Sequence, residues 1–577
     1  MSFFVLANQD RYDLREHADA ISVPGCAVAD VAHGSWQCRF FGDLSGHAPW
    51  VERYGDDAFV GVSGLLLFDG QAAPACLPAL YERFDPTTFD WQGLIGTHAV
   101  ALKKADTLHL FTDGLGASRI YTNAGRTVFS NSFLAMLALT RPKRFDTQAC
   151  YEYVTAGAVY GDRTLVEGIT ALPANSLLSI DADGVVEVTQ RPSPIANEIP
   201  DVPQSLDGFA DYHCGRLEQV FEPIAHSYGD RIRLSFSGGF DSRLMLANLL
   251  KFGARPTLFV YGKDDDEDVR IARHICKAED LPLECIDKGK TPPLAVDAFA
   301  EETEQNLVAF DGWKVETPLF DFGVDRRDRL GRHVDGQVPL NGGLGEIYRN
   351  FFYMPDRPSS TGAVISTFYS RYDPRAFTKR FDEKTFRSAM AQAMREAIGA
   401  TTDDLTRSQV EELYPKFRGR FWTGRDASNN QRFGPMFFPY LEHAAISDTA
   451  KTPIRFKDLG YLQGRMIERI NPRLAGYPSD YGFALDGPRP LKYRVKTWLG
   501  TQRPSALRKL SFRMTHRSPQ PRTGPLAPEY LSTVIDLEFP IMRSLFNLDA
   551  VNSSTQYGLI ATLEYLGQRY NLRVSDD

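Results

Sequence analysis

The 577-residue sequence lacks the features of a membrane or secreted protein. No apolar run approaches the roughly eighteen residues of a membrane-spanning helix, so we expect no membrane span and no membrane partner. The N-terminal stretch has no basic flank followed by a long apolar run, so no secretory signal is expected. Together these absences predict a cytoplasmic protein.

Cysteine and histidine lack the spacings that metal sites require. The seven cysteines are scattered without a Cys-x-x-Cys pair, and the eleven histidines include no His-x-x-x-His pair. These absences argue against a zinc site and against a disulfide framework, and they favour a reducing compartment.

Acidic residues are absent from residues 487–526, which contain ten Lys or Arg. The whole chain carries a formal net charge of −8, so the remainder carries −18. Because six prolines also fall in this basic segment, we expect it to be solvated and partly irregular. The alternative is a binding surface for a polyanion, a carrier or an acidic patch of this same protein.

The length predicts at least two domains. Residues 1–190 are predicted to be rich in β-structure, because short apolar runs alternate with turn residues. The expected strands cover 59–68, 98–103, 107–112, 126–130 and 185–189. Residues 191–206 contain Pro and Ser with little periodicity and are predicted to form a linker.

Residues 207–577 follow a different pattern, in which strands and helices alternate. The expected strands are 234–236, 257–261 and 283–286, and the expected helices are 241–252 and 267–280. This alternation predicts a parallel, doubly wound α/β sheet that binds a nucleotide at the carboxyl ends of its strands. Beyond about residue 360 the apolar spacing is mostly helical.

The most informative motif is Ser237-Gly238-Gly239-Phe240-Asp241-Ser242, which lies between an apolar strand and a helix. A glycine-rich turn at a helix N-terminus lets backbone N–H groups converge on an anion. The serine hydroxyls add donors, and Asp241 can hold a magnesium ion against phosphates. The motif differs from the loop of kinases and GTPases and resembles that of ATP pyrophosphatases, which adenylate a substrate.

The order of motifs resembles the asparagine synthetase family, including its relatives that make β-lactam rings and close lasso peptides. The resemblance covers about residues 90–490. Besides the phosphate loop, the stretches that carry it are Thr112–Tyr121, Phe129–Ala135, Thr164–Pro173, Phe259–Gly262, Leu340–Tyr348 and Pro439–Glu442.

This resemblance implies a glutaminase-like Ntn-hydrolase β-sandwich at 1–190, followed by an ATP pyrophosphatase domain with a helical C-terminal part. The implied reaction is an ATP-dependent carbon–nitrogen ligation, in which a carboxylate is adenylated and then attacked by an amine or ammonia. The implied cofactors are ATP and Mg²⁺. The implied nucleotide-binding residues are Phe236, Ser237, Gly238, Gly239, Asp241, Ser242, Tyr261, Gly262, Asn341, Gly342, Gly343 and Gly345. Asp241 and Glu346 are expected to hold the metal, and Glu346 and Arg349 to be catalytic.

The N-terminal part departs from the family pattern. Ser2 stands where glutamine-using members expose a cysteine, and Ser63-Gly64-Leu65 replaces an Asn-Gly-Glu motif. We therefore expect no glutaminase activity, so that the amine does not come from glutamine.

The synthetase part departs as well. Gly345 and Gly342 fall on acidic family positions, and Asp480 falls on a lysine position. A shift of one residue would let Glu346 serve as the metal-binding acid, and Arg349, Lys457 or Lys492 would supply the missing cation.

Further candidates lie outside these motifs. The acids at 263–268, with Asp268 facing the site, are either metal or substrate ligands or a solvated helix start. Arg425, Asp426 and Asn429 either contact substrate or cap a helix.

Alternatives to the ligase stay open. They are a degenerate homologue that binds nucleotide and a partner, an intramolecular cyclase, and a nucleotide- or tRNA-modifying enzyme supported only by the basic segment. The expected partners are a small-molecule or peptide carboxylate and an amine, with a homodimer or a carrier left open, and no nucleic acid is expected.

Overall fold

The computed structural model describes residues 3–15, 25–55, 57–515 and 520–575. Its N-terminal part contains two six-stranded antiparallel sheets. The first has the order β12 (Ile169–Ala171), β10 (Tyr121–Asn123), β11 (Val128–Ser130), β1 (Phe3–Asn8), β3 (Trp36–Phe41), β2 (Val28–His33). The second has the order β14 (Val186–Gln190), β13 (Ser176–Ile180), β9 (Thr107–Thr112), β8 (His98–Lys104), β5 (Ala58–Gly64), β4 (Trp50–Tyr54).

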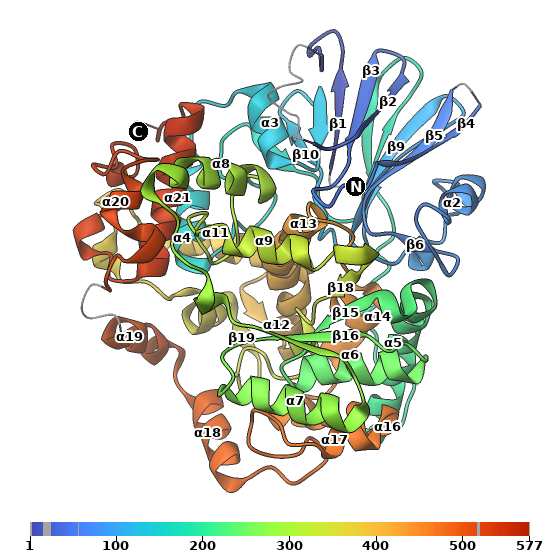
Figure 1. Cartoon of the computed structure of the whole chain (residues 1–577), viewed down its shortest axis with the longest axis vertical. Helices are drawn as coiled ribbons and strands as arrows, with labels where there is room; N and C mark the ends of the chain where they lie inside the picture. The colour runs from blue at the N-terminus through green and yellow to red at the C-terminus, as the bar shows by residue number, and fades with distance from the viewer. Residues whose placement is uncertain (1–2, 16–24, 56, 516–519, 576–577) are drawn as a thin grey trace.

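The facing sides of these two sheets form one apolar core. Phe4 and Phe40 of the first sheet and Val62 and Leu102 of the second belong to the same cluster of buried side chains. Each such side chain stabilises the fold by about 1.5–3 kcal/mol through burial. The expected β-rich N-terminal part is therefore confirmed as two packed antiparallel sheets (Figure 1).

A parallel sheet of four strands follows, as the alternating pattern predicts. Its order is β17 (Leu283–Ile286), β16 (Thr257–Tyr261), β15 (Ile232–Ser235), β18 (Val338–Leu340). Helix α6 (Phe240–Lys251) follows β15, and α7 (Glu267–Glu279) follows β16. Because β18 pairs in parallel with β15, the turn after β18 lies beside the turn that leads into α6.

Helices make up most of the remaining chain. Besides α3 (Phe133–Thr140), α4 (Thr147–Ala156) and α5 (Leu206–Tyr228), the longer ones are α8 (Phe299–Ala309), α9 (Val324–Gly331), α11 (Glu383–Ile398), α12 (Arg407–Leu413), α13 (Gly424–Gln431), α16 (Tyr461–Ile470), α18 (Leu491–Gln502), α19 (Ser505–Thr515) and α21 (Ser554–Tyr570). One cluster of buried residues runs from β1 to the end of α21, so the two parts of the chain share a continuous core.

The predicted linker is packed rather than free. Arg191 is buried, donates to the carbonyl of Asp113 and stacks on the ring of Trp91. Further along, the amide of Ala196 donates to the hydroxyl of Ser447. Residues 191–205 contain no regular helix or strand and connect β14 to α5.

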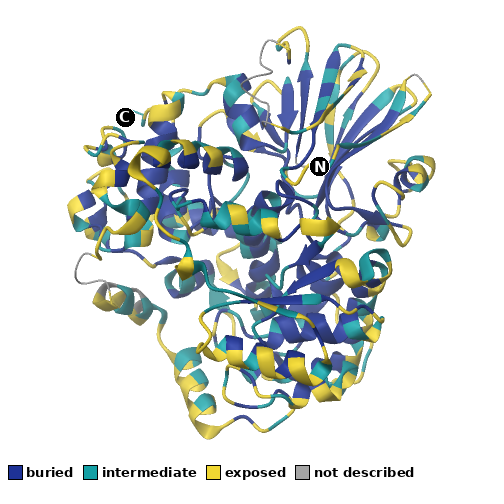
Figure 2. Cartoon of the chain, viewed as in Figure 1, coloured by how far each residue is buried: buried dark blue, intermediate teal, exposed yellow. Residues whose placement is uncertain are grey.

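The basic segment is exposed, as expected, but it is more regular than expected. It forms α18 and α19, which lie at the edge of the molecule (Figures 1 and 2). Pro490 and Pro504 each stand directly before one of these helices, where a proline removes no intrahelical hydrogen bond. These prolines therefore mark the helix starts, and among the described residues the segment is irregular only outside the two helices, at residues 487–490, 503–504 and 520–523.

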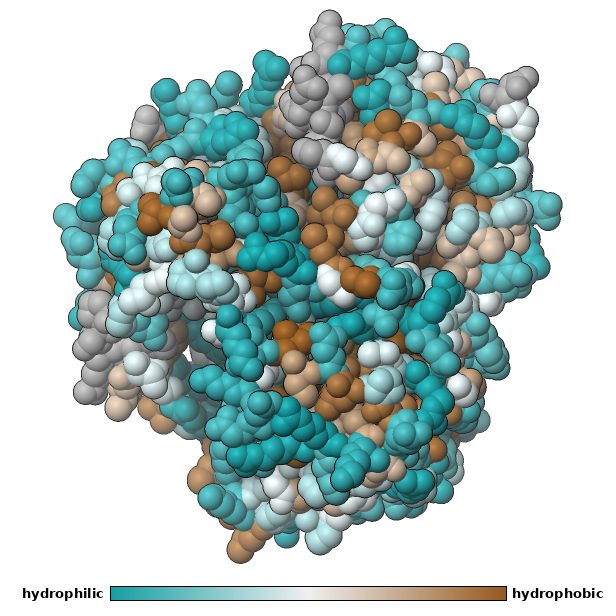
Figure 3. Space-filling view, viewed as in Figure 1, coloured by the Kyte–Doolittle hydropathy of each residue, from teal (hydrophilic) through white to brown (hydrophobic). Residues whose placement is uncertain are grey.

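Large apolar side chains are exposed on the same two helices. Leu491 and Trp498 are 72% and 61% exposed, and brown side chains appear at the lower left of Figure 3, where Figure 1 places α18. Across the part of the chain that the structure describes, no helix is long and apolar enough to cross a membrane.

Candidate functional site

The glycine-rich motif forms the turn between β15 and α6. Gly238 has a φ of +79°, and a Cβ there would collide with the side chain of Ile271, so this position favours glycine. Gly239 begins α6 without a side-chain cap. The first N–H groups of a twelve-residue helix thus stand at the carboxyl edge of the sheet, an arrangement suited to an anion.

Serine hydroxyls flank this turn. Ser237 is partly exposed, and its Oγ accepts a hydrogen bond of 3.4 Å from the amide of Gly239. The Oγ of Ser242 is buried and has no hydrogen-bond partner among the described residues. A buried hydroxyl without a partner is costly unless a ligand satisfies it.

The second glycine-rich loop lies directly against this turn. Asn341 follows β18, and its side chain accepts a hydrogen bond of 2.7 Å from the amide of Gly343. A Cβ at Gly345 would lie 2.6 Å from the carboxyl carbon of Asp241, and one at Gly342 would lie 3.5 Å from its Cβ. The structure thus brings together the two loops that the sequence predicts to act together.

Gly345 also explains one departure from the family pattern. Its Cα faces the carboxylate of Asp241 so closely that no side chain fits there. An aspartate at this position would displace Asp241, and the acid of this loop is instead Glu346.

A charged centre joins the two loops. The Nη2 atom of Arg349 lies 2.6 Å from an oxygen of Asp241 and 3.6 Å from an oxygen of Glu346. Gln463 donates to the other oxygen of Asp241 at 2.8 Å, and Tyr414 donates to Glu346 at 2.7 Å. Both oxygens of Asp241 are therefore already engaged by the protein.

Burial sets the protonation of this centre. It raises the pKa of Asp241 to about 6, while the Arg349 guanidinium opposes the rise and Glu346 adds to it. Burial also raises the pKa of Tyr414, next to Glu346, well above its usual range.

These residues do not fit a magnesium ion held between Asp241 and Glu346. The guanidinium of Arg349 lies between the two carboxylates, and a second cation there would be repelled. Among the described residues there is no group of three or more His, Cys, Asp or Glu side chains that could hold a metal. Arg349 supplies the positive charge between these two carboxylates.

Within the described part of the chain, neither of the other two candidate cations pairs with Asp241 or Glu346. Lys457 is buried and pairs with Glu411 at 2.7 Å, and Lys492 is exposed on α18. Asp480, which replaces a lysine of the family pattern, lies at the phosphate loop, 3.5 Å from where a Cβ of Gly239 would be. Burial and then Asp268 raise the pKa of Asp480, which places Asp268 near the same edge.

Four residues of this site escape prediction from the sequence. Arg243 is fully buried and donates to carbonyl groups of Gly238, Leu474, Tyr477 and Pro478, so it ties the phosphate loop to a distant segment. The position of Arg243, one residue after the motif, is the sequence signal that could have identified it as a site residue. Gln463, Tyr414 and Tyr481 come from separate helices and turns, and no local pattern marks them.

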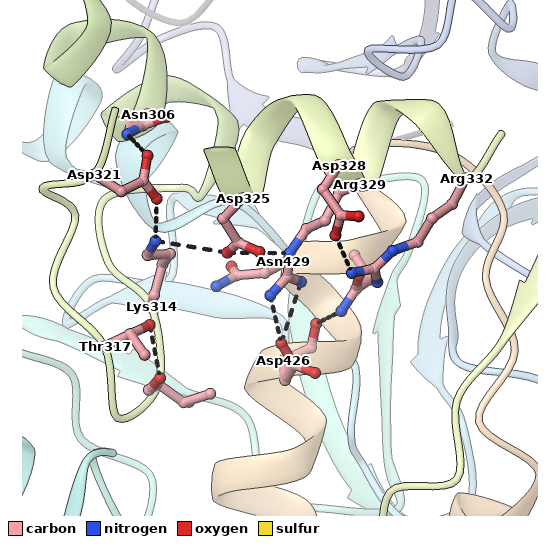
Figure 4. A network of polar contacts seen from close by, with 12 residues as sticks. Asn306, Lys314, Thr317, Asp321, Asp325, Asp328, Arg329, Arg332, Asp426 and Asn429 are labelled. Carbon is pink, nitrogen blue, oxygen red and sulfur yellow. Dashed lines mark hydrogen bonds and ion pairs between the residues drawn. The ribbon is translucent and has the colours of Figure 1, made fainter. Parts of the chain in front are cut away.

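Tyr261 and Gly262, the expected adenine wall, end β16 beside the phosphate loop. The hydroxyl of Tyr261 bonds to Asp328 and Arg332, and Lys288 lies 4.4 Å from the centre of its ring. This tyrosine therefore belongs to a polar network that runs along α9 to α13, part of which Figure 4 shows.

Arg425, Asp426 and Asn429 are structural members of α13. Arg425 pairs with Asp311 at 3.1 Å, Asp426 pairs with Arg329, and Asn429 donates to the carbonyl of Trp313. Figure 4 shows Asp426 facing Arg329. Since these side chains bind other parts of the chain, the structure supports neither substrate contact nor simple helix capping.

One small cavity lies among the described residues at the position of the family's Asn-Gly-Glu motif. Ser63 and Gly64 line a cavity of about 10 Å³, together with Asn131, Asp311 and Arg425. This is space for about one water molecule. Ser2 lies outside the described residues.

A much larger cavity opens next to the charged centre. It has a volume of about 350 Å³ and is lined by Glu346 and Arg349 at one end and by Tyr493 and Arg508 of the basic helices. Ligand sites typically have volumes of about 300–1,000 Å³.

Comparison with known proteins gives little further guidance. No protein-family model and no curated protein matches the chain. A glutamine phosphoribosylpyrophosphate amidotransferase from B. subtilis, complexed with ADP and GMP, is similar at 11% identity over 49% of this chain, with a TM-score of 0.22. The match spans 65% of that enzyme, just under two thirds.

A structure described as the allosteric regulatory enzyme of purine biosynthesis is similar at 9% identity. The match covers 51% of this chain and 82% of that one, with a TM-score of 0.23. These scores are too low to carry an argument, so the resemblance to the asparagine synthetase family stays a prediction.

Proposed function

We propose that this chain is an ATP-dependent ligase that adenylates a carboxylate, releases pyrophosphate and transfers the acyl group to an amine or ammonia. The carboxylate belongs to a small molecule or a peptide. The proposal includes the case in which the attacking amine belongs to the same molecule as the carboxylate. We further propose that it works in the cytoplasm, which its scattered free cysteines favour, without a membrane or nucleic-acid partner.

The observation that carries this proposal is the meeting of two glycine-rich loops at the start of α6. Ser237, the unpartnered hydroxyl of Ser242 and the free N–H groups of the helix face one edge of the parallel sheet. Nucleotides bind at this edge in open parallel sheets. Phosphate oxygens would satisfy these donors.

Arg349 would take the electrostatic role that the sequence assigns to magnesium. A guanidinium is always protonated and binds phosphate or carboxylate through several donors. Because Asp241 and Glu346 hold it in place, it is oriented before a substrate arrives, which favours stabilisation of developing negative charge.

The amine source is external to the N-terminal part. The cavity beside Ser63 and Gly64 is too small for glutamine, and Asp311 and Arg425 fill the adjoining space as an ion pair. We propose that this part serves a structural role.

The test is pyrophosphate release from ATP with a broad panel of carboxylic acids, with and without ammonia or amines. Release that depends on one acid supports the ligase. A Ser242→Ala variant should bind ATP more weakly. The matched control Ser408→Ala, which removes a hydroxyl that lies in α12 and in neither loop and that donates to the carbonyl of Ala450, should bind ATP as the wild type does. Absence of release with every acid contradicts the proposal.

A second candidate is a degenerate homologue that binds nucleotide without turnover. Two observations favour it. Both carboxylate oxygens of Asp241 already accept hydrogen bonds from the protein, and the acidic Asp480 lies at the phosphate loop. Calorimetry should then detect ATP binding that Asp241→Ala weakens, while no pyrophosphate forms under any condition.

A further inference from the structure

The cavity beside the charged centre differs in charge between its two ends. At the inner end, Arg349 pairs with Asp241, and Lys457 pairs with Glu411. These cations already have their counter-charges. The inner end therefore has no excess positive charge, but the buried Nε atom of Arg349 has no hydrogen-bond partner among the described residues and is free to donate to a carboxyl group.

The outer end has uncompensated positive charge. Arg371 and Arg508 line the cavity there, and Arg508 is shared with a neighbouring cavity of about 200 Å³ that Arg503 also lines. Among the residues the structure describes, none of these three arginines forms an ion pair with a carboxylate. The pKa of Arg508 is lowered by burial, by Arg503 and by Arg371, as expected where cations gather without an anion.

Arg508 is held in position by backbone groups. It donates to the carbonyls of Tyr353 and Gly500 at 2.9 Å, and its Nε atom is buried without a partner. A buried donor of a charged group that lacks a partner is costly. An anion at this point would satisfy it.

Aromatic side chains line the cavity between its two ends. Phe351 stacks on Tyr414 and contacts Phe368, while Tyr481 and Tyr493 contact each other and also line the cavity. Such a wall favours an apolar or aromatic ligand segment.

We propose that this cavity binds an elongated acyl substrate with two anionic groups. The reacting carboxyl lies near Arg349, and an apolar or aromatic segment lies along Phe351 and Phe368. A second anion is bound by Arg371 and Arg508, and Arg503 adds positive charge from the neighbouring cavity. This substrate class rests on the proposed ligase function. It excludes short acids with a single charge as the preferred substrates, because they leave the outer arginines without a partner.

The test is calorimetry on the full chain without ATP, using dicarboxylates from succinate to dodecanedioate, each paired with the monocarboxylate of equal length. The dicarboxylate whose length fits the cavity best should bind about tenfold more tightly than the monocarboxylate of equal length. A third series, which ends in a phosphonate instead of the second carboxylate, shows whether the outer arginines prefer a carboxylate or a phosphate group.

Arg371→Gln and, separately, Arg503→Gln should remove the preference for two charges, so that each dicarboxylate binds no more tightly than the monocarboxylate of equal length. The matched control is Arg494→Gln, because Arg494 is exposed on α18 and lines neither cavity. Equal binding of mono- and dicarboxylates at every length overturns the proposal. So does an equal loss in the Arg494→Gln control, because it would show general attraction to the basic segment.

The outcomes separate this inference from the ligase proposal. A preference for dicarboxylates without pyrophosphate release leaves the anionic subsite standing and removes the ligase. Pyrophosphate release with a short, singly charged acid, together with equal binding of mono- and dicarboxylates, supports the ligase and removes the anionic subsite.

Discussion

Replacement of Arg349 by methionine tests whether this arginine stands in the place of a metal ion. The change keeps much of the side-chain volume and leaves Asp241 and Glu346 without their shared cation. Removing one partner of a fully buried pair costs about 3–5 kcal/mol. Here the side chains of Arg349 and Asp241 are 18% and 24% exposed, so we expect roughly 2–3 kcal/mol. For a chain of this length, that corresponds to a fall of about 2 °C in melting temperature.

The assay is thermal unfolding in the presence and absence of magnesium chloride. In Arg349→Met the two freed carboxylates can attract a divalent cation, so magnesium should restore the lost stability. The wild-type protein should show no such response. The matched control is Arg83→Met, because Arg83 and Asp69 form an ion pair of 2.8 Å on the surface, with side chains 59% and 50% exposed. This control should leave the melting temperature unchanged.

Two results would refute the reasoning. Equal melting temperatures for Arg349→Met and Arg83→Met would show that the charged centre contributes nothing to stability. An equal response of wild type and Arg349→Met to magnesium would show that Arg349 does not occupy the cation position.

Three further changes test the structure at separate points. Burial raises the pKa of Glu442 to about 8, compared with 4.5 for an exposed glutamate. Between these two pH values the folded state keeps a proton that the unfolded state releases. The free energy of unfolding should therefore fall as the pH rises from 4.5 to 8. Glu442→Gln should remove this loss, and its unfolding at pH 8 should show a gain of roughly 4 kcal/mol over wild type that is absent near pH 4.5. Gly345→Ala should cost about 1–3 kcal/mol in chemical denaturation and weaken ATP binding, since the new Cβ displaces Asp241; an unchanged affinity would count against the contact between the loops. Gly215→Ala, in the middle of α5 with nothing within 4 Å of the new Cβ, should raise stability by about 0.5–1 kcal/mol, and a loss would show that the helix is packed differently.

Local patterns predict the elements of this fold well. The strands at 257–261 and 283–286 have the expected bounds, α6 is shifted by one residue at both ends, and α7 ends one residue early. These elements are buried on regular spacings, so their periodicity is visible in the chain. The basic segment is more helical than its proline content indicates, because Pro490 and Pro504 stand before helices rather than inside them.

The charged centre shows what a single sequence cannot reveal. The motif predicts that Asp241 and Glu346 lie in one site, and the structure places them on either side of Arg349. However, Gln463 reaches this centre from α16, and Tyr414 reaches it from the π-helix that follows α12. Such contacts depend on how distant helices pack, and no local spacing records them.

The most direct test of the central claim is phosphorus NMR of ATP incubated with the protein, an amine and a mixture of carboxylic acids. The ligase account predicts signals of AMP and pyrophosphate that depend on a carboxylic acid and that are lost when Ser242 is replaced by alanine. Cleavage to ADP and phosphate, or ATP that neither binds nor reacts, would contradict it.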